Sequence, residues 1–414
     1  MNNKKQNKIY IIDVTNRDGV QAPRLSLAKL EKTIVNLYLD KLGIFQSEMG
    51  FPFTDHETNY INANLELVKQ KAIKNLRLSG WCRAIKDDVK KALDLTKLKH
   101  LNLSIPTSDI MLKYKFRNKF QQKDIIKEMR DAVRLAYKYG VETVGVNAED
   151  ASRTGLDFLI KFGKSARKEK AVRLRYCDTI GFENPLSIYK RVNTLAKEVE
   201  LPIELHCHND LGMAVACSVI GAKGVIDAGQ DAYINTTITG IGERAGNADL
   251  ASILLALKYA KSFKNKNLLA SEINLKMIWG LTKYVFYSFG VPIPLGQPGV
   301  GKNAFTHESG IHVDGVLKNK RNYELYDFED LGRKKVETIE TGRKITLGEY
   351  SGINGLKNVY EKLGIKFRDK KETKTILKLV RFASVHTQKL LTKEELLFII
   401  EHPQITRQLL QMKF

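Results

Sequence analysis

Residues 172–208, VRLRYCDTIGFENPLSIYKRVNTLAKEVELPIELHCH, contain two short runs rich in apolar and β-branched residues, separated by a segment with helical spacing. The runs at 172–179 and 203–208 are typical of buried strands. The segment at 185–200 begins with a proline, which the first turn of a helix tolerates. Because a strand, a helix and a second strand in this order are the unit of a parallel sheet, this stretch predicts an α/β fold.

The same alternation continues through about the first 260 residues. Further strands are predicted at 9–15, 44–50, 76–83, 101–106, 143–147 and 232–239. Further helices are predicted at 27–40, 122–139, 213–228 and 248–260. Eight such units in roughly 250 residues match a closed (β/α)8 TIM barrel. An open doubly wound sheet is the alternative, and the absence of a Gly-x-Gly-x-x-Gly motif after the first strand disfavours it.

The pattern changes after about residue 262. Residues 291–301 (VPIPLGQPGVG) are rich in Pro and Gly and predict a connector, while helices are predicted at 375–385 and 393–401. We therefore expect a C-terminal, mostly helical accessory region appended to the barrel. The expected division is a barrel at 1–265, a linker and first accessory subdomain at 266–345, and a second helical subdomain at 346–414.

Composition excludes several classes of protein. Of the 414 residues, 43% are hydrophobic, which is enough to build a core and excludes a disordered or fibrous chain. The sequence shows neither a signal peptide nor an uninterrupted apolar stretch of about 18 residues, so we expect no membrane span. The four cysteines form no Cys-x-x-Cys pair and are too few for a disulfide framework. We therefore expect a cytoplasmic protein.

The chain is strongly basic, with 68 Lys and Arg against 46 Asp and Glu and a formal charge of +22. This balance indicates anionic partners such as nucleic acid, anionic membranes, phosphorylated cofactors or carboxylates. An AT-rich genome, which favours lysine codons, gives the same balance without any function. A barrel that only binds nucleic acid would need a Lys/Arg stripe interleaved with exposed aromatic residues. Since the best basic run, at 164–175, has no aromatic residue, we expect no nucleic-acid partner.

His206 and His208 give the strongest local signal for chemistry. Residues i and i+2 of a strand face the same way, so both imidazoles would point into the barrel mouth, where TIM barrels place their active sites. Asp18 follows the first predicted strand and Asn247 follows the eighth, and these strands are neighbours in a closed barrel. Two imidazoles, a carboxylate and an amide oxygen suit Mn2+, Mg2+, Fe2+ or Zn2+. The alternative is that the histidines are merely hydrogen-bonded at the strand end.

A divalent cation at this place would polarise a carbonyl group, and a 2-oxo acid can bind it through its keto oxygen and its carboxylate. Arg17 and Arg83 are candidates to neutralise carboxylates through forked hydrogen bonds, although Arg17 is equally suited to a structural ion pair. His312, beyond the barrel repeat, is a candidate proton carrier near neutral pH. Its alternative is a surface-loop histidine.

Four motifs occur in order along the chain: DVTNRDGVQ at 13–21, HCHNDLG at 206–212, GERAGN at 242–247 and NAFTHESGIH at 303–312. Together they resemble the signatures of the isopropylmalate synthase and homocitrate synthase family. Members of this family are metal-dependent TIM-barrel enzymes of Claisen condensation, related to 3-hydroxy-3-methylglutaryl-CoA lyase. The resemblance implies that acetyl-CoA, the co-substrate, condenses with a 2-oxo acid and that water then releases CoA.

The resemblance also implies the metal site. Asp18, His206 and His208 would hold the divalent ion, for which Mn2+ is favoured, with Asn247 as a further or weaker ligand. Arg17 would assist the keto oxygen of the 2-oxo acid.

The remaining matching residues would contact the substrates. Gln21 would line the same pocket as Arg17, and Thr179 matches a threonine that contacts the substrate carboxylate. Glu149 would lie near the acetyl group. His312 would act with Glu149 in deprotonating the acetyl methyl group or relaying its proton.

The chain departs from the usual family pattern at residues 108–111, where SDIM replaces S-D-x-H, so a substrate-side histidine is missing. The first motif also has TNRDGVQ where TLRDGEQ is usual. These departures point to a divergent branch that includes Re-citrate synthase, and they favour oxaloacetate as acceptor, giving citrate. The alternatives are 2-oxoglutarate, giving homocitrate, and 2-oxoisovalerate, giving isopropylmalate. We also expect a homodimer or higher homo-oligomer, in which His312 acts in cis or at the active site of the partner subunit.

Overall fold

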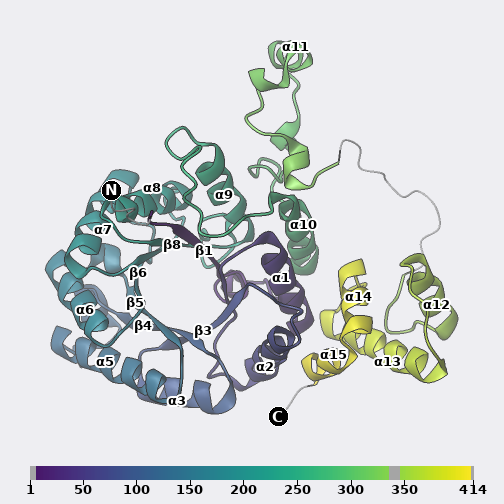
Figure 1. Ribbon diagram of the computed structural model, residues 1–414, viewed down its shortest axis with the longest axis horizontal. Helices are drawn as coiled ribbons and strands as arrows, with labels where there is room; N and C mark the ends of the chain where they lie inside the picture. The colour runs from purple at the N-terminus through teal and green to yellow at the C-terminus, as the bar shows by residue number, and fades with distance from the viewer. Residues whose placement is uncertain (1–5, 335–345, 412–414) are drawn as a thin grey trace.

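The computed structural model describes residues 6–334 and 346–411, and its first part is a closed barrel of parallel strands in the order β1 to β8 (Figure 1). The strands are β1 (Ile9–Asp13), β2 (Gln46–Glu48), β3 (Arg77–Arg83), β4 (His100–Pro106), β5 (Thr143–Glu149), β6 (Arg173–Asp178), β7 (Ile203–Cys207) and β8 (Ala232–Thr236). Each predicted strand is present, with ends shifted by a few residues. The predicted TIM barrel is therefore confirmed.

Helices surround the barrel and cover its outer face (Figure 1). They are α1 (Lys29–Leu42), α2 (Asp55–Lys69), α3 (Lys86–Leu95), α4 (Asp109–Tyr114), α5 (Gln122–Lys138), α6 (Leu156–Lys168), α7 (Pro185–Val199), α8 (Ala214–Asp227) and α9 (Leu250–Tyr259). Helix α7 shows why the sequence starts a helix where it does. The Asn184 side chain accepts hydrogen bonds from the backbone N–H groups of Leu186 and Ser187, and Pro185 occupies the first turn, where it forfeits no helical bond.

Aromatic side chains close the amino-terminal end of the barrel. Tyr10 stacks on Tyr233 with ring centroids 4.6 Å apart, and Phe45 packs edge-on against both rings. The guanidinium of Arg173 lies over the Tyr233 ring, 5.1 Å from its centroid. The barrel is thus a packed core at this end, and the cavity described below opens at the opposite, carboxyl end of the strands.

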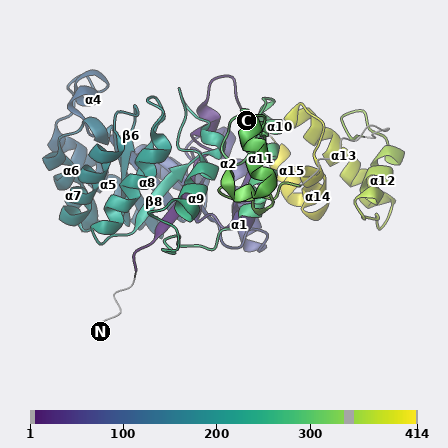
Figure 2. The same cartoon turned by 90° about the horizontal axis from the view of Figure 1, so that it is seen from above.

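The accessory region lies beside the barrel, against α1 and α2 (Figures 1 and 2). Its helices are α10 (Ile278–Phe289), α11 (Gly310–Lys318), α12 (Ile353–Lys362), α13 (Lys370–Thr387), α14 (Lys393–Glu401) and α15 (Pro403–Leu410). A buried hydrogen bond from the Tyr284 hydroxyl to Glu395 Oε1, 2.9 Å long, joins α10 to α14. The predicted helical accessory region is confirmed. The division at residues 265 and 345 remains a prediction, and residues 1–5, 335–345 and 412–414 of it lie outside the described residues.

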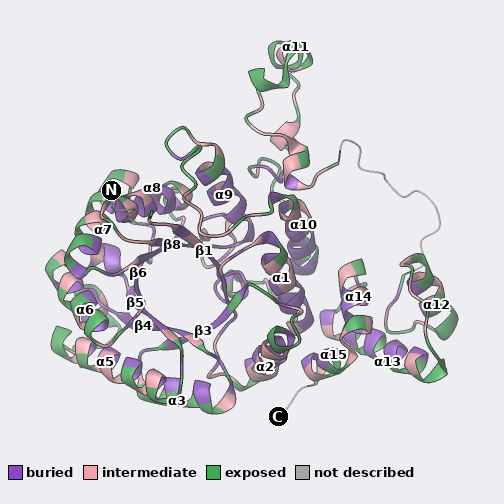
Figure 3. Ribbon diagram, in the orientation of Figure 1, coloured by how far each residue is buried: buried purple, intermediate pink, exposed green. Residues whose placement is uncertain are grey.

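Helix α11 projects away from the barrel as part of an arm formed by residues 302–333 (Figures 1 and 3). Two of its apolar side chains are largely exposed, Ile311 at 75% and Leu317 at 82%. This position matters for His312, which lies on the same helix. Across the described ranges, no helix has both the length and the apolar character needed to cross a membrane.

Candidate active site

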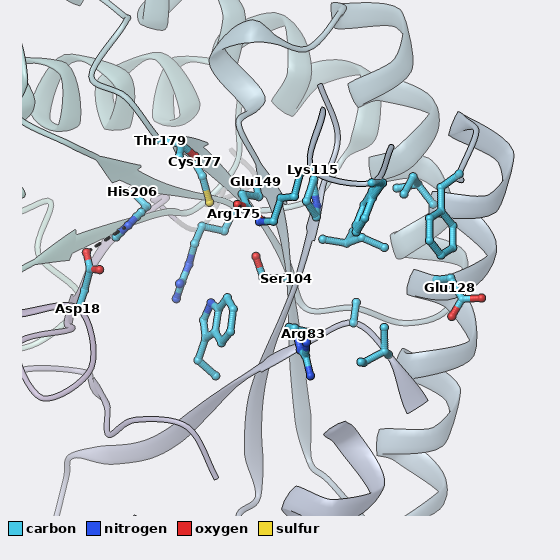
Figure 4. Close-up of a pocket in the computed structure, with 18 of the residues that line it drawn as sticks. Asp18, Arg83, Ser104, Lys115, Glu128, Glu149, Arg175, Cys177, Thr179 and His206 are labelled. Atoms are coloured by element: carbon cyan, nitrogen blue, oxygen red, sulfur yellow. Dashed lines mark hydrogen bonds and ion pairs between the residues drawn. The ribbon is translucent and has the colours of Figure 1, made fainter. Parts of the chain in front are cut away.

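A cavity of about 450 Å³ opens at the carboxyl ends of the strands (Figure 4). Asp18 and His206 lie at one end of it, and Glu128 lies at the other. The lining also includes the apolar side chains of Phe116 and Phe120. A cavity of this size and place is typical of a small-molecule site in a TIM barrel. The predicted site residues that line it are Arg17, Asp18, Arg83, Glu149, Thr179, His206 and His208.

Asp18, His206 and His208 form a compact buried cluster. Asp18 Oδ2 lies 3.5 Å from His206 Nε2 and 3.9 Å from His208 Nε2. The two imidazole rings are perpendicular, with centroids 5.0 Å apart. One ligand atom from each residue falls within 4.8 Å of the others, so the three converge as the sequence predicted.

The atoms of this cluster fit a divalent cation. Within the described residues, Asp18 Oδ2 and the nearby Asn247 Oδ1 are buried and accept no hydrogen bond. Burial lowers the pKa of both histidines and so favours the neutral imidazole, which is the form that binds metal. Burial alone would raise the pKa of Asp18, but nearby positive charge, that of the Arg17 guanidinium above all, outweighs it and holds that pKa below its usual value. A carboxylate and two neutral imidazoles are a suitable donor set for a divalent metal.

Asn247 is held beside the cluster by the backbone. Asn247 pairs with His208 through an antiparallel β-bridge, and the residue is only 4% exposed. The GERAGN motif therefore brings the predicted fourth ligand next to the histidines.

Beneath the cluster, a layer of paired charges fills the barrel. Glu48, fully buried, accepts hydrogen bonds from Arg17 Nε (2.7 Å), Arg175 Nη2 (2.7 Å) and Asn102 Nδ2 (2.6 Å). Arg175 also donates through Nε to Glu204 Oε1, at 2.5 Å. Arg17 in turn places Nη1 3.0 Å from Asp18 Oδ1. This layer fixes the Arg17 side chain under the candidate metal site.

Glu149 and Thr179 lie together in the cavity (Figure 4). Thr179 Oγ1 accepts a 2.9 Å hydrogen bond from the backbone N–H of Asp150, which joins the ends of β5 and β6. Glu149 Oε1 accepts a 2.6 Å hydrogen bond from Lys115 Nζ. Glu149, which was predicted to lie near the acetyl group, is therefore paired with Lys115, a residue that was not predicted from the sequence.

Three other predicted site residues lie apart from the cluster of Asp18, His206 and His208. Arg83 lines the cavity, but its Nε and Nη2 are both bound by Asp88, at 2.6 and 2.8 Å. Gln21 is exposed and lies outside the cavity lining, with its Oε1 3.5 Å from Arg17 Nη1. His312 is exposed on α11, where its ring stacks on Tyr323 at 4.1 Å between centroids. Within one chain the structure does not bring His312 to the cavity.

Three residues of the site, Arg175, Glu204 and Lys115, were not predicted from the sequence. A signal existed for the first two, since the barrel-facing positions of a strand alternate. Arg175 pairs in register with Glu204, which lies two residues before His206 and so on the same face of its strand. Lys115 had no such signal, because its place depends on the path of the chain after β4.

Comparison with known proteins gives a consistent result along the whole chain. Residues 8–285 match the HMGL-like family model, and residues 300–387 match the model described as homocitrate synthase post-HMGL domain-like. The chain is 56% identical over 407 residues to Citrate (Re)-synthase of Dehalococcoides mccartyi, covering 98% of each chain. It is 36% identical over 398 residues to 2-isopropylmalate synthase 2 of Caldanaerobacter subterraneus subsp. tengcongensis, covering 96% of each.

Solved structures agree with the fold. Hydroxymethylglutaryl-CoA lyase from Pseudomonas aeruginosa superposes with a TM-score of 0.55 at 15% identity, covering 70% of this chain and 96% of that one. The relatives bear the names of the synthases that the four motifs resemble, which confirms that resemblance and the expected enzyme type. The chain therefore belongs to the HMGL-like family, together with the citrate and isopropylmalate synthases to which it is similar over nearly its full length.

Proposed function

We propose that this protein condenses acetyl-CoA with oxaloacetate and hydrolyses the thioester, giving citrate and free CoA. The observation that carries the proposal is the buried cluster of Asp18, His206 and His208 beside Arg17, at the end of a cavity of small-molecule size. The 56% identity to Citrate (Re)-synthase supports oxaloacetate over 2-oxoglutarate and 2-oxoisovalerate as the acceptor.

In this proposal Asp18, His206 and His208 hold a divalent metal, with Asn247 as a further ligand. Such a metal, for which we favour Mn2+, would supply a Lewis acid for the keto group of the 2-oxo acid. Arg17 lies against Asp18 and lines the cavity, so its guanidinium stabilises the negative charge that develops on the keto oxygen.

The acetyl group is activated by proton removal. Glu149, with His312, takes a proton from the acetyl methyl group, and the resulting carbanion attacks the keto carbon. The new alkoxide is protonated, and water then cleaves the thioester. A positioned general base of this kind is worth about 10²–10⁴-fold in rate.

Thr179, Gln21 and Arg83 complete the proposed substrate-binding set. Thr179 contacts the carboxylate next to the keto group, and Gln21 acts through Arg17. Arg83 contributes its positive field at the cavity edge, since Asp88 holds its Nε and Nη2.

We also propose a cytoplasmic homodimer. The arm at residues 302–333 exposes apolar side chains on α11, including Ile311 and Leu317, which suits contact with a second copy. In such a dimer His312 completes the site of the partner subunit.

The test is an assay of the purified, Mn2+-loaded protein with acetyl-CoA and each 2-oxo acid in turn. Release of CoA is followed by its free thiol, and the product is identified by mass. We expect oxaloacetate to be the best acceptor and citrate the product. If 2-oxoglutarate or 2-oxoisovalerate releases CoA and oxaloacetate does not, the citrate assignment is wrong.

A further inference from the structure

We propose that Lys115 binds the carboxylate of the 2-oxo acid that is distal to the keto group, and so selects a dicarboxylic over an apolar acceptor. This inference rests on the proposed function of the same cavity and adds a specificity-determining residue to it.

Four cationic side chains line the cavity, and they differ in how far their donors are already used. They are Arg17, Arg83, Lys115 and Arg175. Each of the three arginines contacts carboxylates of the protein itself through at least two of its nitrogens. Within the described residues, Lys115 contacts a single carboxylate, Glu149, although an ammonium group carries three N–H donors. Lys115 is therefore the cation with the most capacity for a substrate anion.

The chain holds Lys115 in place rather than leaving it on a free loop. Lys115 directly follows α4 as its C-cap residue, and its backbone N–H donates to Met111 O at 2.9 Å. The first turn of α4 is anchored by Ser108, whose hydroxyl donates to the carboxylate of Asp150. Asp150 directly follows Glu149, so the helix that carries Lys115 is tied to the strand end that carries its partner. The ammonium is thereby positioned over Glu149 while its side chain remains 51% exposed.

The location of this pair suits the distal carboxylate. Figure 4 places Lys115 and Glu149 between the Asp18–His206 end of the cavity and the Glu128 end. A 2-oxo acid held by its keto end near Asp18 extends its distal group toward this middle region. A carboxylate placed farther along would approach the negative charge of Glu128, whereas beside Lys115 it meets an ammonium that can bridge it to Glu149.

On this proposal Lys115 is needed only for binding a 2-oxo acid whose distal group is charged. Removal of its charge would leave the distal carboxylate facing Glu149 without a cation between them. The two negative charges would then repel each other. A 2-oxo acid whose distal group is a methyl would lose nothing comparable. Because Lys115 also pairs with Glu149, its effect on substrate choice is given by the difference between the two acids and not by the absolute rate with one of them.

The experiment compares oxaloacetate with 2-oxobutyrate, which also has four carbons but ends in a methyl group, using wild-type protein, Lys115→Met and Lys113→Met. Lys113 lies on α4 but does not line the cavity, so it controls for charge and helix stability. We measure kcat/KM for oxaloacetate, and for 2-oxobutyrate both turnover and Ki against oxaloacetate. We expect Lys115→Met to lower kcat/KM for oxaloacetate by about 10- to 100-fold, the range of a charge-assisted hydrogen bond, and to leave both the turnover and the Ki of 2-oxobutyrate within about threefold. Lys115→Arg, which keeps the charge, is expected to restore part of the loss.

Two results would overturn the inference. An equal loss for both acids would show that Lys115 serves Glu149 or the fold, and no loss for either would show that it does not touch the substrate. Failure of the proposed function gives a different result, because wild-type protein would then release no CoA with oxaloacetate. In that case the same variants are compared on 2-oxoglutarate and 2-oxobutyrate, and a loss confined to 2-oxoglutarate would still support Lys115 as the group that binds a distal carboxylate.

Discussion

Replacement of Glu48 by Gln tests the charged layer under the candidate metal site. Glu48 is fully buried and receives hydrogen bonds from Arg17, Arg175 and Asn102. In the wild-type layer the positive charges of Arg17, Arg173 and Arg175 balance the negative charges of Asp18, Glu48 and Glu204. The Glu48→Gln variant keeps the size of the side chain but leaves one buried positive charge without a partner.

The expected cost follows from that imbalance. Removing one partner of a buried ion pair costs about 3–5 kcal/mol of unfolding free energy. The amide oxygen of Gln still accepts one of the bonds, so we expect a value near the lower end of this range.

The dependence on pH has a definite sign. Burial alone would raise the pKa of Glu48, but Arg175 and Arg17 outweigh it and hold that pKa well below its ordinary value of 4.5. A carboxylate with a depressed pKa stabilises the folded state above its ordinary pKa, and that stability is lost as the pH falls toward the folded-state pKa. The difference between wild type and Glu48→Gln is therefore expected to be complete near pH 7 and to shrink below a pH of about 4.5.

The assay is urea unfolding of both proteins, followed by far-UV circular dichroism and tryptophan fluorescence. The matched control is Glu66→Gln, which breaks a 3.0 Å pair with Lys69 on the exposed face of α2. Exposed pairs contribute about 1 kcal/mol or less, so the control loss is expected to be small. Equal losses in the two variants at pH 7 would show that the charged layer does not stabilise the barrel.

Three further predictions concern the site. Asp18→Asn is expected to abolish tight Mn2+ binding, measured by the electron paramagnetic resonance of free Mn2+. The control Asp210→Asn, outside the cluster, is expected to bind Mn2+ as the wild type does. Tight binding by Asp18→Asn would contradict Asp18 as a ligand. Mixed subunits carrying His312→Ala and Asp18→Ala are expected to recover CoA release that neither parent shows, and a hybrid without activity would argue against a shared site. Arg83→Gln is expected to lower kcat/KM for oxaloacetate by less than about fivefold, since exposed charge pairs are worth at most about 1 kcal/mol and Asp88 already occupies two nitrogens; a larger loss in the steady-state assay would place Arg83 on the substrate.

The barrel could be predicted because its strands carry a local signal. Runs such as 203–208 are short, carry apolar residues at alternate positions and are flanked by helical segments, so each could be recognised without knowledge of its neighbours. The exact ends could not, because tertiary contacts set them. The predicted last strand at 232–239, for example, stops at Thr236, and the chain then turns through a short 3-10 helix at Ile238–Gly240.

The cluster of Asp18, His206 and His208 was predictable for a similar reason, while other parts of the site were not. The i, i+2 spacing of His206 and His208 fixes their common direction on one strand, and barrel closure brings Asp18 opposite them. The pairing of Arg83 with Asp88 depends on side-chain rotamers, which no spacing specifies. The position of His312 depends on how the arm leaves the barrel, and that path is set by a connector without periodic pattern.

The sequence departure at residues 108–111 and the specificity proposed for Lys115 concern the same helix. Ser108 caps α4, and the SDIM segment, where the family usually has a histidine, forms its first turn. The layer of paired charges below the cavity has no net charge, and its charged groups bind one another. It therefore does not distinguish one 2-oxo acid from another. Discrimination between acceptors therefore has to come from the edge of the cavity. Lys115, directly after α4, places an ammonium group there. On our proposal Lys115, the residue directly after α4, is the cation that meets the second carboxylate of the acceptor, and the comparison of oxaloacetate with 2-oxobutyrate tests that relation directly.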